Sequence, residues 1–154
     1  MMDIKLNVEA DIDLTAIQNQ FNSVVYDDVT MMRIHALFAK LIEPWVPMDT
    51  GILAHGYEIT PQHIKYHGPY AHYMYMGEVY GPNFAQFDDA GNLIGFRSPP
   101  KKHPTGRSLI YSTEKHPKAS KEWDKAAYPE IKDQFLEGVK AILIRRMQEL
   151  YGSR

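Results

Sequence analysis

The sequence predicts a single α+β domain, in which a small antiparallel β-sheet made of hairpins packs with a long N-terminal helix and a C-terminal helix. Apolar residues recur at helical spacing towards both ends of the chain. Turn-forming residues divide the middle of the chain into short alternating segments. At 154 residues the chain can bury one core, and no linker divides residues 1–154, so we expect one domain.

The N-terminal part is predicted to form a strand and then a long helix. Residues 3–9 alternate apolar and polar side chains, as a half-buried strand does. Apolar residues at three- and four-residue steps then extend a helix over about 14–42, and residues 26–29 are the place where it would bend. Pro44 ends the helix, because proline has no backbone N–H and disfavours helix in the residue before it.

A first hairpin is predicted over about 52–67. Before it, the segment Asp49, Thr50 and Gly51 combines a side-chain acceptor with a residue that tolerates positive φ, which is typical of a tight turn. Gly68 and Pro69 end the hairpin. The run after them, rich in tyrosine and methionine, fits one face of a helix and one face of a strand equally well.

A second hairpin is predicted over about 84–96, around a glycine-containing tip. Asp88 and Asp89 at this tip are adjacent carboxylates. Acid–base catalysis would require them to converge on a substrate, whereas a hairpin tip directs them into water, so we expect turn chemistry. The proline- and lysine-rich stretch 98–106 is expected to be an exposed basic loop.

The C-terminal part is predicted to be helical. After a short strand at 109–111, a helix over about 120–127 carries Trp123. Pro129 suits the first position of a second helix over about 129–150, whose apolar residues form one stripe.

The composition excludes several classes of function. The chain has no cysteine, which excludes disulfides, thiolate metal sites and a cysteine nucleophile, and which fits a reducing compartment. The first residues lack the features of a signal peptide, and no apolar run approaches the ~20 residues of a membrane span. The net charge of −2 argues against nucleic-acid binding by bulk electrostatics. We therefore expect no membrane partner and no sequence-specific nucleic acid.

Charge is unevenly distributed along the chain. Residues 1–30 hold six acids and one base, a net charge of −5, whereas residues 97–125 hold eight bases and three acids, a net charge of +5. Opposite patches on one subunit suit head-to-tail packing of identical copies. The alternative is that both runs are solvated surface.

No motif indicates a catalytic or cofactor site. The chain contains no GxSxG elbow, no GxxxxGK[ST] and no GxGxxG. A metal site would have to use histidines, but their spacing matches no metal motif, so we expect surface or interface histidines, no metal and no cofactor. The histidines concerned are His55, His63, His67 and His72.

The Tyr/Met-rich run and the basic residues after it are the candidates for a protein interface. Tyrosine and methionine are enriched at interfaces, but such a run is also common in a core, and both interpretations stay open. The candidate interface residues are Tyr70, Tyr73, Tyr75, Met76, Tyr80, Lys101, Lys102, Lys118 and Lys121.

Two motifs resemble those of a known family. Pro47-x-Asp49-Thr50-Gly51-x-Leu53 resembles the P-x-D-T-G-x-L opening of small virion proteins of tailed phages, the minor capsid and head–tail joining (neck or tail-completion) proteins. In that family a hairpin follows, then a P-Y-A-x-Y…G segment, which is similar to residues 69–77 here. The family has an acidic residue before an aromatic residue and a glycine, whereas this chain has Tyr75-Met76-Gly77 followed by Glu78, so no role is carried over for that acid.

The resemblance covers roughly residues 45–150, including a Trp-bearing segment at 121–126 and the C-terminal helix. It implies a non-enzymatic virion protein at the head–tail junction, made in the host bacterial cytoplasm, which forms a homo-oligomeric ring between portal and tail or caps the tail. The implied partners are further copies of itself, portal or adaptor proteins, and tail-tube or tail-terminator proteins. The alternatives from other classes are a small metal hydrolase that uses the histidines, and a monomeric adaptor that holds a peptide through the tyrosines.

Overall fold

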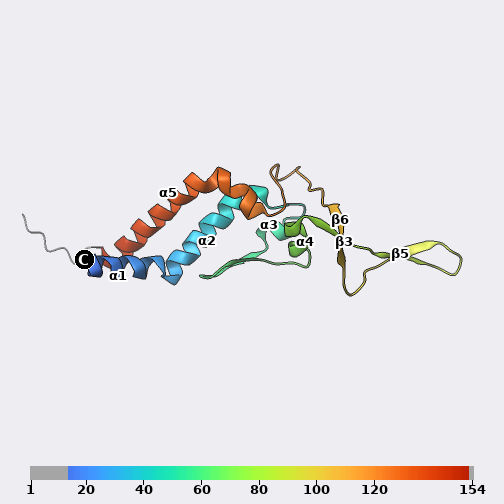
Figure 1. Cartoon of the computed structure of the whole chain (residues 1–154), viewed down its shortest axis with the longest axis horizontal. Helices are drawn as coiled ribbons and strands as arrows, with labels where there is room; N and C mark the ends of the chain where they lie inside the picture. Colours follow the sequence, from blue (N-terminus) through green and yellow to red (C-terminus); the bar gives the residue numbers. More distant parts are fainter. Residues whose placement is uncertain (1–13, 153–154) are drawn as a thin grey trace, which may run out of the picture.

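The computed structural model describes residues 14–152, so the predicted strand at 3–9 lies outside the described residues. The molecule is elongated (Figure 1). A helical body occupies one end, two small sheets and two short helices form the middle, and a hairpin projects from the other end. The prediction of an α+β fold with antiparallel hairpins and a C-terminal helix is confirmed.

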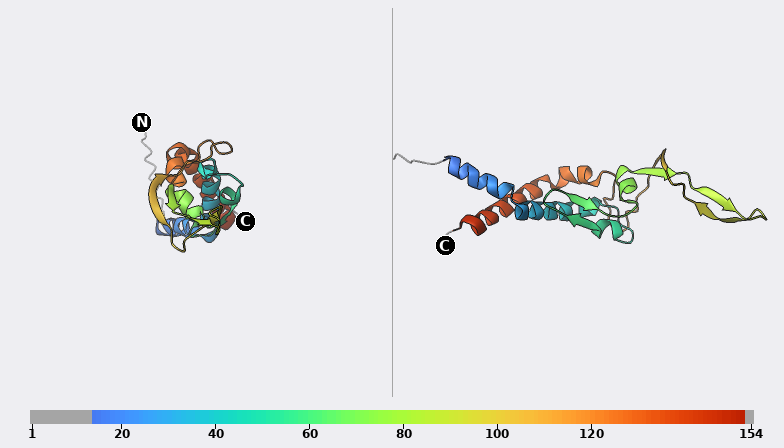
Figure 2. Two further views of the ribbon diagram at one scale, coloured as in Figure 1. Left: turned by 90° about the vertical axis from the view of Figure 1, so that its right-hand side faces the viewer. Right: turned by 90° about the horizontal axis from the view of Figure 1, so that it is seen from below.

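The helical body consists of α1 (Leu14–Val25), α2 (Asp28–Ile42) and α5 (Trp123–Tyr151), with α5 packed along α2. The right-hand view of Figure 2 shows that α1 and α5 cross and then diverge towards the free end of the body. The prediction of one continuous helix over 14–42 is wrong, although the place of the expected bend is right. Asp27 has an extended backbone, and its carboxylate accepts a hydrogen bond from the Thr30 N–H at 3.1 Å. The extended backbone of Asp27 thus separates α1 from α2, and its side chain caps the N-terminus of α2.

The prediction of two C-terminal helices over 120–127 and 129–150 is also wrong, because α5 runs unbroken through Pro129. Trp123, Ala127 and Ile131 follow at four-residue steps and are all buried in the core. Pro129 lies on the exposed side of the same turns. Tertiary packing of the buried face therefore outweighs the hydrogen bond that proline cannot donate.

The main core lies where the helical body meets the middle section. Ile42, Val46 and Ala54 pack against the first two turns of α5, together with Trp45 in a 3₁₀ turn (η1, Glu43–Trp45). Trp123 is 3% exposed. The rings of Tyr66 and Tyr75 pack against the Trp123 ring in a T-shaped arrangement, with ring centroids 5.3 and 4.9 Å from the centroid of Trp123.

The first predicted hairpin is shorter than expected and begins with a helix. Residues Ile52–His55 form α3, and only Tyr57–Ile59 (β1) and Ile64–Tyr66 (β2) pair as antiparallel strands. The helix starts because Gly51 adopts φ of 88° and its carbonyl accepts from the His55 N–H at 3.0 Å. Four residues are too few for sequence periodicity to separate such a helical turn from a strand.

The ambiguous Tyr/Met-rich run forms α4 (Ala71–Met76). Gly77 ends α4 at φ of 70°, and the chain continues as β3 (Glu78–Gly81). β3 pairs with β6 (His103–Ser108), so the expected basic loop over 98–106 is partly a strand. The strand expected at 109–111 is absent from the described structure, apart from one hydrogen bond from the Leu109 N–H to the Gly77 carbonyl at 2.9 Å. The position of β6 is determined by its long-range pairing with β3, and the local sequence pattern does not contain this information.

The second hairpin is confirmed. β4 (Phe84–Phe87) and β5 (Leu93–Arg97) pair as antiparallel strands, and we call residues 84–97 the arm. At the tip, the Asp88 carboxylate accepts from the N–H groups of Ala90 and Asn92 at 3.0 and 2.7 Å, and Gly91 has φ of 82°. The hydrogen bond from the Asn92 side chain holds the pKa of Asp88 below its ordinary value. Asp88 therefore has the turn role expected from the sequence.

An ion-pair cluster joins the C-terminal part of α5 to the junction between α1 and α2. Arg146 on α5 donates to both carboxylate oxygens of Asp27, at 2.9 and 3.2 Å. Glu149 accepts from Arg33 on α2 at 3.1 Å and from Arg146 at 3.1 Å. The hydrogen bond from Arg146 lowers the pKa of Asp27, and the hydrogen bond from Arg33 is the main cause of the lowered pKa of Glu149.

This cluster predicts a defined acid sensitivity. A carboxyl whose pKa is lower in the folded protein stabilises it above the unfolded-state pKa, and this contribution disappears as the pH falls through the folded-state pKa. We therefore expect Asp27→Asn, which can still cap α2, to lower the free energy of unfolding at neutral pH. The difference from wild type should shrink as the pH falls below 3.8, the ordinary pKa of aspartate. Urea unfolding at several pH values measures this; a difference that does not change with pH would contradict the assignment.

Candidate functional site

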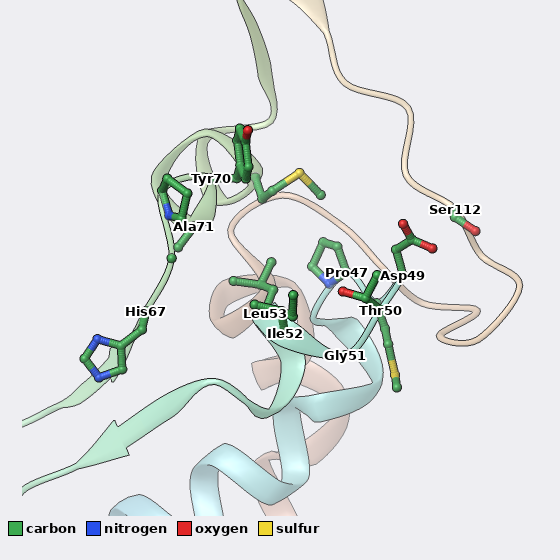
Figure 3. A pocket seen from close by; sticks show the side chains of 14 residues that line it. Pro47, Asp49, Thr50, Gly51, Ile52, Leu53, His67, Tyr70, Ala71 and Ser112 are labelled. Carbon is green, nitrogen blue, oxygen red and sulfur yellow. The ribbon is translucent and has the colours of Figure 1, made fainter.

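The two motifs that carry the family resemblance meet at one pocket (Figure 3). The pocket has a volume of about 380 Å³ and is open to solvent on one side. Tyr70 and His67 approach it from one side and Ser112 from the opposite side, with Ile52 and Leu53 between them. It is lined by residues 47–53, residues 67–71, Met74 and Ser112.

The chemistry of the pocket is that of a receptor for an apolar group. Pro47, Met48, Leu53 and Met74 provide apolar walls, and Ile52 at its edge is exposed. Its polar side chains are Asp49, Thr50, His67 and Ser112, and no hydrogen bond joins two of them in the way that a nucleophile is joined to its base. Its size is that of sites that hold a small ligand or the anchor side chain of a protein partner, about 300–1,000 Å³.

Gly51 sets the shape of the pocket wall. Its φ of 88° lies in the left-handed region, and a Cβ at this position would be 3.2 Å from Nδ1 of His55. We expect Gly51→Val to destabilise the protein by at least about 1–2 kcal/mol, because a β-branched residue is strained there. Asparagine tolerates this region, so Gly51→Asn should cost less. Thermal unfolding of both variants checks the expectation, and wild-type unfolding of Gly51→Val would show that the turn was misassigned.

The tyrosines of the Tyr/Met-rich run divide between surface and core. Tyr70 and Met76 are exposed, while Tyr73 and Tyr80 are half-buried with ring centroids 4.5 Å apart. The Tyr75 hydroxyl donates to Asp124 at 2.9 Å, beside Trp123. Burial, followed by this hydrogen bond, raises the pKa of Tyr75. Tyr75 thus helps to join α4 to α5.

Tyr75 and its neighbour Tyr66 provide a matched pair of variants. The buried Tyr66 hydroxyl has no hydrogen-bond partner within residues 14–152, and burial raises its pKa. We expect Tyr66→Phe to leave stability unchanged or raise it, because no hydrogen bond is lost. Tyr75→Phe should cost about 1 kcal/mol, because Asp124 loses a donor. Urea unfolding compares the two; equal losses in both variants would be inconsistent with the two environments.

The four histidines that a metal hydrolase would use have separate surroundings. His55 lies 3.4 Å from Glu43, and His67 lies 3.5 Å from Glu58. His72 packs its ring against Tyr73, and His63 is exposed in the turn before β2. Within the described part of the chain, no three histidine or acidic side chains are grouped closely enough to hold a metal ion.

The candidate lysines also have different environments. Lys118 pairs with Glu130, and its ammonium lies 4.4 Å from the centroid of the Trp45 ring. The stem of Lys121 covers Gly77, where a Cβ would be 2.6 Å from that of Lys121. Lys101 and Lys102 lie in the turn before β6, and no carboxylate of residues 14–152 is within ion-pair distance of them. These two remain available to a partner.

The arm, a hairpin expected from the sequence to reach towards a partner, contains apolar candidates that are absent from the predicted interface residues. In its register, Ala85 faces Phe96 and Phe87 faces Leu93, so these four side chains share one face of the hairpin. This apolar face is exposed, with Phe87 60% and Phe96 64% accessible. The other face is mixed, with Gln86 and Arg97 beside Phe84. The sequence shows apolar residues at every second position on both sides of the tip. Their exposure could not be predicted, because it depends on whether another element packs over the hairpin.

Within residues 14–152, no helix combines the length and the apolar composition that a membrane span requires. In comparisons with known proteins, no family model, no curated protein and no solved structure matches this chain significantly.

Proposed function

We propose that this protein is a non-enzymatic structural subunit of a tailed-phage virion. It is a minor capsid or head–tail connector protein that oligomerises into a ring between portal and tail, at the neck or at the tail end. Its partners are further copies of itself, portal or adaptor proteins, and tail-tube or tail-terminator proteins.

The main support for a role in assembly is the exposed apolar face of the arm. A two-stranded hairpin without a packed face is at best marginally stable in water. Here the arm projects beyond the other described elements, and none of the elements within residues 14–152 covers it (Figures 1 and 2). Exposed apolar patches with polar surroundings mark protein-interaction sites. Such an exposed element is explained if the arm becomes ordered and buried when the subunits assemble.

The pocket supports the family assignment. Both motifs that resemble the phage virion proteins, at 47–53 and 69–71, contribute to its lining although they are separated by the first hairpin. The residues that carry the resemblance therefore lie together at one surface feature of this chain. The separate surroundings of the histidines offer no comparable support for a hydrolase.

Immunogold electron microscopy tests this function. An antibody raised against the purified protein would be applied to tailed particles released by the bacterium that carries the gene. We expect gold at the junction of head and tail, or at the tail end. Particles that remain unlabelled, while free protein accumulates in the lysate, would contradict the proposal.

A further inference from the structure

We propose that the arm of one copy inserts its apolar face, near Phe87 and Leu93, into the pocket of a second copy. This inference rests on the proposed function, because it specifies the contact that would build the ring. Each chain then contributes one projecting element and one receptor, and each copy uses both.

The geometry excludes the same contact within one chain. The arm leaves the middle section at Gly81 and extends along the long axis away from α3 and α4 in both views (Figures 1 and 2). The pocket is built from the segments around α3 and α4. The arm tip of one copy is therefore directed away from its own pocket and is free to reach another.

The two surfaces match in chemistry and size. Phe87, Leu93 and Ile94 next to the tip are all exposed. The pocket of about 380 Å³ has room for an aromatic anchor, and Ile52 and Tyr70 at its edge are themselves exposed apolar groups. A central apolar anchor in a pocket, surrounded by a polar rim, is the arrangement that gives most of the affinity of protein interfaces.

Charge favours the same pairing. The arm holds two acids, Asp88 and Asp89, at its tip and one base, Arg97, at its opposite end. The segment 109–121, which passes the pocket at Ser112, holds three lysines and one glutamate. Lys115 in this segment donates to the backbone carbonyl of Asp49 at the pocket edge, so its ammonium lies beside the receptor. The Asp49 carboxylate is also at this edge and reduces the positive charge there. Lys118 is already paired with Glu130, so Lys115 and Lys121 are the lysines of this segment that can attract the acidic arm tip.

Contacts between two different surfaces of identical subunits are heterologous. Such contacts close into a ring when the rotation between neighbours is a whole fraction of a turn. An arm-in-pocket contact therefore gives the kind of assembly that the proposed function requires, whereas pairing of two arms by their like faces would stop at a dimer.

The absence of cysteine allows a direct test by cross-linking. One full-length variant carries Ala90→Cys at the exposed arm tip, and a second carries Ser112→Cys at the pocket. The two proteins are mixed and treated with a short bis-maleimide. We expect a covalent product that contains one copy of each variant. The control mixture combines Ala90→Cys with Ala141→Cys, an exposed position on α5, and should give little product.

The outcomes separate this contact from the proposed function. Efficient cross-linking of the first mixture, with little product in the control, supports the arm-in-pocket contact. If the proteins associate but the first mixture gives no more product than the control, this contact is overturned while a ring built through another surface stands. If sedimentation shows that none of the variants nor the wild type associates, both the contact and the ring are contradicted.

Discussion

Replacing Trp123 by alanine is expected to destabilise the protein by about 3–5 kcal/mol, the usual cost of removing a buried aromatic side chain. Trp123 is 3% exposed and fills the junction between the helical body and the middle section. It contacts Tyr66 and Tyr75 directly, so its loss removes a ring contact from each of them. Urea unfolding followed by circular dichroism measures the change.

Tyr128 on the same helix provides the control, because it is exposed. Tyr128→Ala should change the free energy of unfolding by less than about 1 kcal/mol. A loss below about 1 kcal/mol for Trp123→Ala itself would contradict the position of Trp123 at the centre of the core.

The second large effect is expected on assembly. Phe87→Ser combined with Phe96→Ser removes two aromatic rings from the apolar face of the arm, and should weaken self-association at least about tenfold. The thermal stability of the helical body should not change, because the arm lies outside the core. Sedimentation velocity over a range of concentrations measures the association.

Phe84→Ser is the matched control, since Phe84 is 51% exposed on the same hairpin but lies on its mixed face. It should leave association close to that of the wild type. Equal weakening by both changes would indicate that hairpin stability, and not the apolar face, controls assembly.

Local signals predicted the parts of the fold that local chemistry determines. The bend expected at residues 26–29 is where α1 ends and α2 begins, and the turn residues of the second hairpin marked the arm tip. In each case a side-chain acceptor or a glycine fixes a few residues without help from distant parts. The continuity of α5 through Pro129 could not be predicted in this way, because it depends on burial of Trp123, Ala127 and Ile131 against other elements.

In the candidate site, too, local turns could be predicted from the sequence, whereas the packing of distant segments could not. The sequence placed turns at Gly51 and Gly68, and both have positive φ. It could not show that these turns share one pocket, because that requires the packing of α3 and α4 in three dimensions. The sequence also could not show that Tyr75 packs beside the core while Tyr70 is exposed, because both residues belong to the same tyrosine-rich run.

Native mass spectrometry of the full-length wild-type protein, beside the Phe87→Ser and Phe96→Ser double variant, tests most directly whether the chain assembles through its arm. We expect a closed oligomer of one size for the wild type and a monomer for the variant. A wild type that stays monomeric at every concentration, or a variant that forms the same oligomer, would contradict this account.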